Sequence, residues 1–583
     1  MGQSSSTESQ ETATFTNGKL SRGELESAFI REVTRSFQPI ELMSLRDNLG
    51  LQELQGTTVV TMRQITNIIE LPETPATQDM TNCISFLARF PNYRTGPDLN
   101  VAGVLKVLAI LNPEKFAQLF GNNTRYFLML IFLALSFDSR NESDPDKSEK
   151  ILCSDDLVDV VYLQDKLQWM LIPQVQSFDG IEFSQYPLPA SKLLRVLTLL
   201  LYIAPISLEA KHSQPLGALF QFDDLSWLEY EKKAMNLLRS FDLDLTSSNY
   251  TSKKIIFSTF EKIIGTSYSN GTMPNLLVPL HHLLDSLLYS TRTTLHDIEF
   301  ADSRILTRPM LSQLATILPD ELVFTRLKKL FVGAESGFSM RSMESKVFKW
   351  NAPTILLVSG KLIEMQPSSG PVPKNKKYAA FLTEYPRFHA SNNNSPQPPS
   401  ADDDSYTFMV YLQKPWKISN SECFGDEHSF IAQLSPRQII YPSSAYAHNY
   451  AYFNTLGGGL GFGSKPPLIK NNVRIFKPGE VSLTIEAAME IACFRHLAVP
   501  GTYKTGSIFP HNVPEFEISI NITNLEVWGC GSQKELEEQK KLWEWENREA
   551  EARKKLNAMH WDDGRALLEM AGMIGKDQSG GSV

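Results

Sequence analysis

The stretch Leu456-Gly-Gly-Gly-Leu-Gly-Phe-Gly463 is the most constrained part of this sequence, because so many glycines in one short run need a backbone reason. Glycine tolerates positive φ and lets another backbone approach closely. Ser443–Asn454 before the run is rich in Tyr and Phe, and Leu468–Phe476 after it mixes Leu, Ile and Val, so both flanks indicate strands. We therefore predict a bend between two strands, with a structural motif formed by Gly457, Gly458, Gly459, Gly461, Phe462 and Gly463.

A phosphate-binding loop is the alternative interpretation of these glycines. Such a loop needs Gly-x-Gly-x-x-Gly at the start of a helix, or Lys followed by Ser or Thr. Here the position three beyond Gly461 is Ser464, and Lys465 is followed by Pro466. Neither spacing is present, which favours the structural turn.

The segments after the glycine run predict strands that complete a β domain. Val481–Glu486 and Phe516–Ile522 alternate apolar and polar residues, and Leu525–Gly529 closes the sheet. The pattern predicts a two-sheet β domain with peripheral helices. In the last segment Glu526 precedes Trp528 and Gly529. Glu526 is either a buried acid with a raised pKa or a surface carboxylate that braces the last strand, and we prefer the second interpretation.

Four motifs resemble one known family in their order along the chain. They are Trp416–Gly425, Glu427–Pro436, Gly459–Gly463 and Leu525–Gly529, and together they are similar to the TLDc domain. The resemblance covers roughly Ser303–Cys530 and is most specific to fungal members named for telomere capping. It implies an α+β protein in which 303–530 is the TLDc domain.

The earlier part of this domain contains a predicted insert. Pro353–Val358 and Tyr378–Leu382 resemble the early strands of the family. The stretch near 366–404 is rich in Pro, Asn and Asp, which predicts disordered loops, with a strand over Tyr378–Phe388 between them.

Length and composition predict a soluble protein of two or three domains. The chain has 583 residues, 42% hydrophobic content and a net charge of -9. This charge argues against a general nucleic-acid surface, which needs clustered Lys and Arg. Five sparse cysteines, an odd number, indicate free thiols in a reducing compartment.

The N-terminus fits the pattern for acylation. Met1-Gly-Gln-Ser-Ser-Ser6 matches the N-myristoylation motif, in which Gly2 receives the acyl chain. A single chain anchors only weakly and reversibly, and no basic cluster follows it before Phe15. We therefore expect residues 1–20 to be a flexible acylated tail that attaches reversibly to a membrane surface.

Residues 21–296 show the periodicity of an all-helical region, in one or two units. The apolar positions at three-and-four spacing are Leu25, Phe29, Val33, Leu42, Leu45 and Leu49. The apolar runs Tyr126–Phe137 and Leu193–Leu208 are shorter than the roughly 20 residues of a spanning helix, so we predict buried core helices.

The resemblance also implies that the first unit of this region is similar to a degenerate pair of EF-hands. A calcium loop needs Gly at position six and Glu at position twelve. A loop starting at Asp242 places Ser247 and Lys253 at these positions. We therefore expect no calcium site, and we identify no other metal, cofactor or small-molecule substrate.

Catalytic motifs are not recognisable in the sequence. No nucleophile elbow, metalloprotease motif or Cys/His pair at a family-specific spacing is present. Cys493, near Arg495 and His496, is the cysteine with cationic neighbours that could lower its pKa. The main interpretation is a protein without enzymatic activity. The alternative is an enzyme of oxidative-stress protection that uses a TLDc thiol or carboxylate.

Residues 533–575 predict a C-terminal helical extension. Many opposite charges at three-and-four spacing favour a long helix, and the apolar residues near a seven-residue rhythm include Trp543 and Leu556. The helix either folds back on the β domain or binds a partner through Trp543 and Leu556.

The resemblance implies an adaptor or regulator that binds subunits of the vacuolar proton-pumping ATPase and affects assembly of the pump. It also implies an indirect influence on telomere capping. With the acylation motif, it implies a cytoplasmic protein attached reversibly to the vacuolar membrane.

Overall fold

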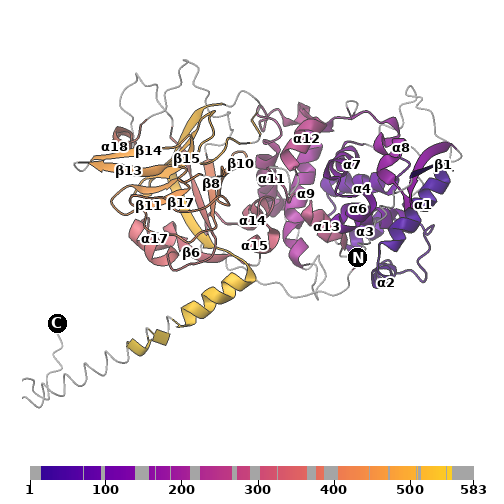
Figure 1. The fold of residues 1–583 in the computed structure, drawn as a ribbon, viewed down its shortest axis with the longest axis horizontal. Coiled ribbons are helices and arrows are strands. Elements are labelled where there is room, and N and C mark those ends of the chain that lie inside the picture. The colour runs from indigo at the N-terminus through magenta and orange to yellow at the C-terminus, as the bar shows by residue number, and fades with distance from the viewer. Residues whose placement is uncertain are drawn as a thin grey trace, which may run out of the picture.

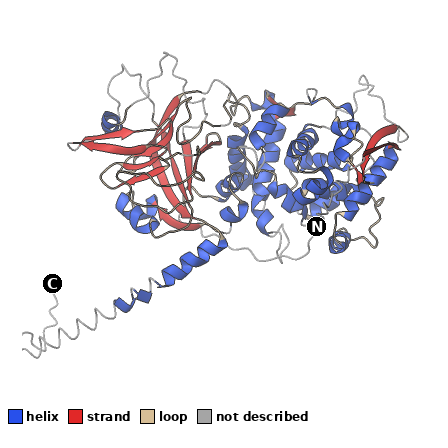
Figure 2. Ribbon diagram, in the orientation of Figure 1, coloured by secondary structure: helices blue, strands red, loops and turns tan. Residues whose placement is uncertain are grey.

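The computed structural model describes residues 15–553 apart from positions 70, 94–98, 138–155, 165, 184–185, 210–223, 266–271, 286, 289–302, 325, 364–375, 387–404, 446, 471–472, 507, 510–513, 546–547 and 550. The helices gather in one half of the molecule and the long strands in the other, which confirms the α+β class (Figure 2).

The helical half contains α1 (Arg22–Arg35), α2 (Pro39–Asn48), α3 (Met62–Ile68), α4 (Pro75–Ala88), α5 (Val101–Leu111), α6 (Pro113–Phe120), α7 (Thr124–Ser136), α8 (Pro173–Gln176), α9 (Ala190–Glu209), α11 (Asp224–Leu238), α12 (Phe257–Ile264) and α13 (Val278–Asp285). α1 begins at a capping box, in which Ser21 and Glu24 bond to each other's backbone N–H. Its buried face carries Leu25, Phe29 and Val33, as the spacing predicts.

The two apolar runs form core helices, as predicted. α7 buries most of its side chains, and α9 packs against α4, α11 and α13. Within the described part of the chain, no helix combines the length and the apolar character needed to cross a bilayer.

Short strands accompany these helices, which the helical periodicity did not predict. β1 (Phe15–Ser21) pairs antiparallel with β2 (Leu157–Leu163), which also pairs with β3 (Lys166–Leu167). β4 (Leu188–Pro189) pairs with β5 (Lys254–Ile255). Residues 15–20 therefore belong to a sheet, and the prediction of a flexible tail over 1–20 is wrong for them. Residues 1–14 lie outside the described part of the chain.

The β half contains β6 (Lys328–Val332), β7 (Thr354–Leu362), β8 (Ser405–Leu412), β9 (Phe430–Ser435), β10 (Ile439–Pro442), β11 (Ala451–Asn454), β12 (Gly459–Phe462), β13 (Lys465–Lys470), β14 (Val473–Lys477), β15 (Val481–Ile485), β16 (Ile491–His496) and β17 (Phe516–Gly529). Its helices are α14 (Arg308–Ala315), α15 (Asp320–Phe324), α16 (Gly333–Ser336), α17 (Met340–Val347) and α18 (Lys376–Glu384). Ten strands form one sheet in the order β10-β9-β8-β7-β17-β16-β15-β12-β11, with β6 also paired to β17.

This single sheet folds over into two layers (Figure 1). β8 and β16 are separated by two strands in the sheet order, yet the rings of Phe408 and Phe494 stack with centroids 4.9 Å apart. β17 joins the layers. Its two ends are buried, its middle is partly exposed, and its register with β7 shifts between Ile522 and Asn524. The predicted two sheets are therefore two layers connected through β17.

Helices cover the outer faces of both layers. Met310 and Leu314 of α14 pack in one cluster with Ile355 and Met409 of the first layer. α18 contacts β14 beside the second layer.

The segment around Tyr378 is a helix, so the strand predicted over Tyr378–Phe388 is wrong. Tyr378, Phe381 and Tyr385 point to one side and form a small core with Phe476, Ile491 and Cys493. Their spacing of three and four residues is helical, but their aromatic content favoured a strand. Most of the insert, over 364–375 and 387–404, lies outside the described residues.

Candidate functional site

The glycine run makes the hairpin between β11 and β12. Residues 455–458 form the turn, and the second half of the run is the strand β12 itself. Gly459 has φ +67°, and a Cβ there would overlap the carbonyl oxygen of Ile485 on β15. A Cβ on Gly461 would overlap the ring of Tyr452, its partner across the hairpin. The glycines therefore serve close strand packing, and the bend is shorter than predicted.

The turn is fixed by polar contacts and by its flanking rings. The Asn454 side-chain oxygen accepts from Gly458 N at 2.9 Å, and Arg474 donates to the carbonyl of Gly457 at 3.0 Å. Gly463, with φ +77°, ends β12, and Phe462 is buried beside Trp416. The turn's polar groups are thus used within the fold.

Glu526 is completely buried, so the interpretation as a surface carboxylate is wrong. Its Oε1 accepts from the backbone N–H groups of Arg304 and Ile305, at 2.8 and 3.0 Å. Its Oε2 accepts from Ser303 Oγ at 2.8 Å and from Trp528 Nε1 at 3.0 Å. The carboxylate does brace the last strand, because it ties β17 to the segment that precedes α14.

The end of β17 packs equally closely. Gly529 lies against the indole of Trp350, where a Cβ would overlap the ring. Trp528 is 1% exposed and packs with the residues of α14. Glu526, Trp528 and Gly529 thus seal one end of the β domain.

The described thiols are held in their protonated form. Burial raises the pKa of Cys493 and of Cys530 well above the ordinary value, and it raises the pKa of Cys423 to about 11. Beside Cys493, the charge of Arg495 is compensated by Glu517, whose Oε2 lies 2.8 Å from Nη2. A reactive cysteine needs a lowered pKa and solvent access. Cys493 has neither.

The loop that starts at Asp242, in which we expect no calcium site, contains an ion pair of its own. Lys253 Nζ, at the position where a calcium loop has Glu, lies 2.8 Å from Asp242 Oδ2. The ammonium therefore contacts the carboxylate that would begin the set of calcium ligands.

The start of the C-terminal extension is a helix over 533–545 that docks on the β domain. Gln539 donates to the carbonyl of Lys349 at 2.7 Å and accepts from Asn351 N at 3.0 Å. Trp543 packs on Trp350, and Lys328 Nζ lies 3.9 Å from the centroid of the Trp543 ring. Trp543 therefore lies in a part of the extension that folds back on the β domain. Leu556 lies outside the described residues.

A buried polar seam joins the helical half to the β half. Gln438, before β10, donates through its backbone N–H to Asn236 O and accepts at its carbonyl from Ser240 Oγ. Its side chain donates to the Thr272 carbonyl of the helical half at 3.4 Å. Within the β half it donates to Thr316 Oγ1 at 2.9 Å and accepts from Gln313 Nε2 at 3.1 Å. Gln438 is fully buried, so these bonds hold the two halves in one orientation.

Two buried arginines extend the seam. Arg239 of the helical half donates to the Pro436 carbonyl at 3.0 Å, and Arg437 donates to the Leu243 carbonyl. Burial and the nearby Arg239 lower the pKa of Arg437 to about 10. Both guanidinium groups are bonded across the junction.

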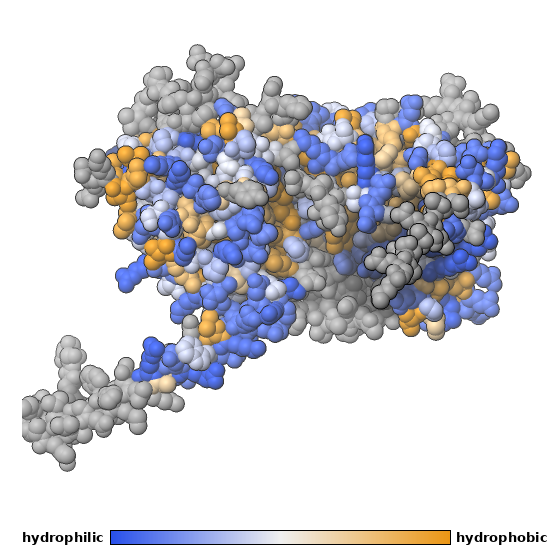
Figure 3. Space-filling model, viewed as in Figure 1, coloured by the Kyte–Doolittle hydropathy of each residue, from blue (hydrophilic) through white to orange (hydrophobic). Residues whose placement is uncertain are grey.

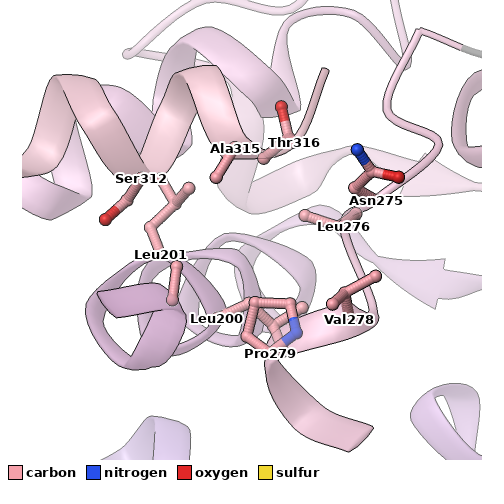
Figure 4. A pocket seen from close by; sticks show the side chains of 10 residues that line it. Leu200, Leu201, Asn275, Leu276, Val278, Pro279, Ser312, Ala315 and Thr316 are labelled. Atoms are coloured by element: carbon pink, nitrogen blue, oxygen red, sulfur yellow. The ribbon is translucent and has the colours of Figure 1, made fainter. Parts of the chain in front are cut away.

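A small cavity lies near this seam, between α9, the segment leading into α13, and α14 (Figure 4). Its volume is about 10 Å³, roughly the space that one water molecule needs. Leu200, Leu276 and Ala315 are among its lining residues, with the polar side chains of Asn275 and Thr316. It is too small for an organic ligand.

Comparison with known proteins shows to which family this chain belongs. A family model described as the TLDc domain matches residues 300–531. Proteins named Restriction of telomere capping protein 5 align along their whole length with the whole of this chain, with 37% identity in Komagataella phaffii, 34% in Lachancea thermotolerans and 33% in Saccharomyces cerevisiae (strain S288c). The chain belongs to this TLDc family. Membership supports the role of a TLDc regulator.

Within the TLDc domain, the structure separates the predicted site residues into two groups. The glycine run lies at the β11–β12 hairpin, whereas Glu526 and Trp528 lie on β17 beside α14. They form two structural clusters and no common pocket among the described residues.

The TLDc seam residues were missed by sequence reasoning. Gln313 stands among Met310, Leu311 and Leu314 of α14, and a polar amide on such an apolar helix is a signal that could have found it, because a buried amide requires partners. Gln438 directly follows Ser435, Pro436 and Arg437, so its own segment carries no such signal.

Proposed function

We propose that this TLDc protein is a non-enzymatic adaptor or regulator that binds the vacuolar proton-pumping ATPase and affects its assembly. It acts on the cytoplasmic side of the vacuolar membrane, to which an acyl chain on Gly2 attaches it reversibly. Its influence on telomere capping, the process named in its relatives, is indirect.

The burial and hydrogen bonding of the candidate reactive groups support the proposal that the protein is not an enzyme. Cys493 is buried, with a raised pKa, and Glu526 uses both carboxylate oxygens to hold β17. An enzyme needs a group that can reach its substrate in the right protonation state. Both residues instead hold the fold, so the alternative of an oxidative-stress enzyme loses the groups on which it depends.

The C-terminal helix supports binding to a partner. Its first part is fixed to the β domain by Gln539 and Trp543, and beyond this point the helix projects away from the domain (Figure 1). Trp545, on the projecting part, is 53% exposed. An exposed aromatic side chain on a helix that projects from its domain can lie in a groove of a partner protein.

The test is a pull-down of the tagged full chain from cells, with membrane partners identified by mass spectrometry. Wild type, Gly2→Ala and Trp545→Ala are compared, with Leu225→Ala as the control for an exposed apolar side chain in the helical half. We expect pump subunits with wild type and the control, fewer with Gly2→Ala, and fewer with Trp545→Ala.

Absence of pump subunits from every sample would reject binding to the pump. Protection of cells against oxidants then becomes the next assay. Loss of protection in Cys493→Ser at unchanged thermal stability would establish the enzyme alternative instead.

A further inference from the structure

The hairpin of β13 and β14 exposes an apolar surface at the end of the molecule farthest from the helical half (Figure 1). Leu468 and Val473 are each 52% exposed, and Ile475 is 48% exposed. Figure 3 shows apolar side chains over this hairpin at the far left. Three half-exposed aliphatic residues on one small ribbon are unusual for a surface without a partner.

The register of the hairpin places these residues on its outer face. Leu468 pairs directly with Ile475, and side chains alternate between the faces of a strand, so Val473 lies on the face of Ile475. The opposite face is used by the fold, because Phe476 is buried in the cluster with α18. The aliphatic residues therefore have no role in covering the core.

The charged residues of the hairpin itself have one sign. Residues 464–479 contain three Lys and one Arg and no Asp or Glu. Arg474 is paired with Glu384 at 2.8 Å. Lys465 and Lys477 face each other in the register, and neither has an ion pair among the described residues. Like charges directly opposite each other destabilise a sheet, so an anion at this place would relieve the repulsion.

We propose that the outer face of the β13–β14 hairpin docks on an anionic lipid bilayer, with Leu468, Val473 and Ile475 in the interface and Lys465 and Lys477 on lipid headgroups. Basic residues beside aliphatic ones are the combination that binds an anionic membrane surface.

This contact goes beyond acylation and does not depend on it. One acyl chain binds a membrane only marginally, and a second signal makes attachment stable. β1, which follows the acylated tail, and the hairpin lie at opposite ends of the long axis (Figure 1). The two points of attachment are therefore separated along the molecule.

The test is co-sedimentation of the unacylated full chain with vesicles of phosphatidylcholine, with and without phosphatidylserine. Unacylated protein separates this contact from Gly2. We expect binding to the anionic vesicles that weakens as salt is raised. Removing both charges in Lys465→Gln/Lys477→Gln lowers partitioning about 25-fold, at about fivefold for each lysine. Ile475→Ser lowers partitioning about tenfold.

Matched controls change the same kinds of residue elsewhere in the domain. Lys361→Gln/Lys504→Gln alters net charge equally, and Ile418→Ser removes another isoleucine side chain that is 48% exposed. Both controls should bind like wild type, and all variants should keep the wild-type melting temperature.

Equal binding of wild type to neutral and anionic vesicles, or unchanged binding of the hairpin variants, would overturn the proposal. The proposal would also be overturned if the wild-type chain bound no vesicles but associated with itself, and if Ile475→Ser abolished that self-association. The face would then join two copies of the chain.

Discussion

Replacement of Glu526 tests how the β domain is closed. The carboxylate accepts from two backbone N–H groups, of Arg304 and Ile305, and from the indole N–H of Trp528, in addition to the Ser303 hydroxyl. The hydroxyl can rotate toward another acceptor, but the other three donors are fixed. Glu526→Ala therefore leaves three fixed donors without their acceptor.

The cost follows from the number of donors. A hydrogen bond to a charged group contributes about 1.5 kcal/mol at the low end, so Glu526→Ala should lower the free energy of unfolding by about 4 to 5 kcal/mol. In Glu526→Gln the amide oxygen can keep the Arg304 and Ile305 bonds, and its NH₂ group can donate to Ser303. The Trp528 indole then faces another donor, so the expected loss is about 2 kcal/mol.

The assay is urea unfolding of the full chain, followed by circular dichroism, together with hydrogen exchange at the Arg304 and Ile305 amides. Exchange at these amides should become faster in Glu526→Ala and remain slow in Glu526→Gln. A loss below about 1 kcal/mol in Glu526→Ala, or equal losses in the two variants, would refute the bracing role. Loss of cellular function in Glu526→Gln, with stability and amide exchange both unchanged, would point to a chemical role.

Three further predictions concern a histidine, the seam and the C-terminal helix. Burial lowers the pKa of His496 from 6.5 to about 4, so the unfolded chain binds a proton at a higher pH than the folded chain does. The free energy of unfolding should therefore fall by about 1.4 kcal/mol per pH unit as the pH drops from 6.5 to 4, and keep its full value above pH 6.5. Urea unfolding of His496→Gln should show a flatter pH profile. Gln438→Leu removes the side-chain bond to Thr272 of the helical half, together with the bonds to Thr316 and Gln313, and should lower the free energy of unfolding by about 1 to 2 kcal/mol. Limited proteolysis at the junction of the two halves should become faster, and an unchanged cleavage rate would contradict the role of this side chain. Trp543→Ala removes the contacts with Trp350 and Lys328 and should weaken docking of helix 533–545 by roughly 2 kcal/mol. Hydrogen exchange over this helix should become faster in Trp543→Ala but not in Trp545→Ala. Equal increases in the two variants would contradict a specific anchor at Trp543.

Local patterns predicted much of the fold. The spacing of Leu25, Phe29 and Val33 gave the buried face of α1, because a helix that packs on a core needs one apolar stripe. The alternation in Phe516–Ile522 gave a strand, which is the first half of β17. These features depend on neighbours within a few residues, which a sequence displays directly.

The features that sequence reasoning missed depend on distant partners. Glu526 is buried because Ser303, 223 positions earlier, comes to meet it, and no local pattern shows that encounter. β1 is a strand because β2 pairs with it. The helix α18 shows a different failure, since the aromatic residues Tyr378 and Phe381 favour strands locally, while their joint packing against Phe476 favours a helix.

The position of β17 has a consequence for synthesis of the protein. This strand is the last of the β domain in sequence, yet it pairs with β6, β7 and β16 and joins the two layers. While the chain emerges from the ribosome, the helical half can begin to fold, but the earlier strands wait for their central partner. Strands that wait with open edges are prone to aggregate. A premature stop codon before residue 516 would therefore leave a β domain that cannot close, with its helical half intact.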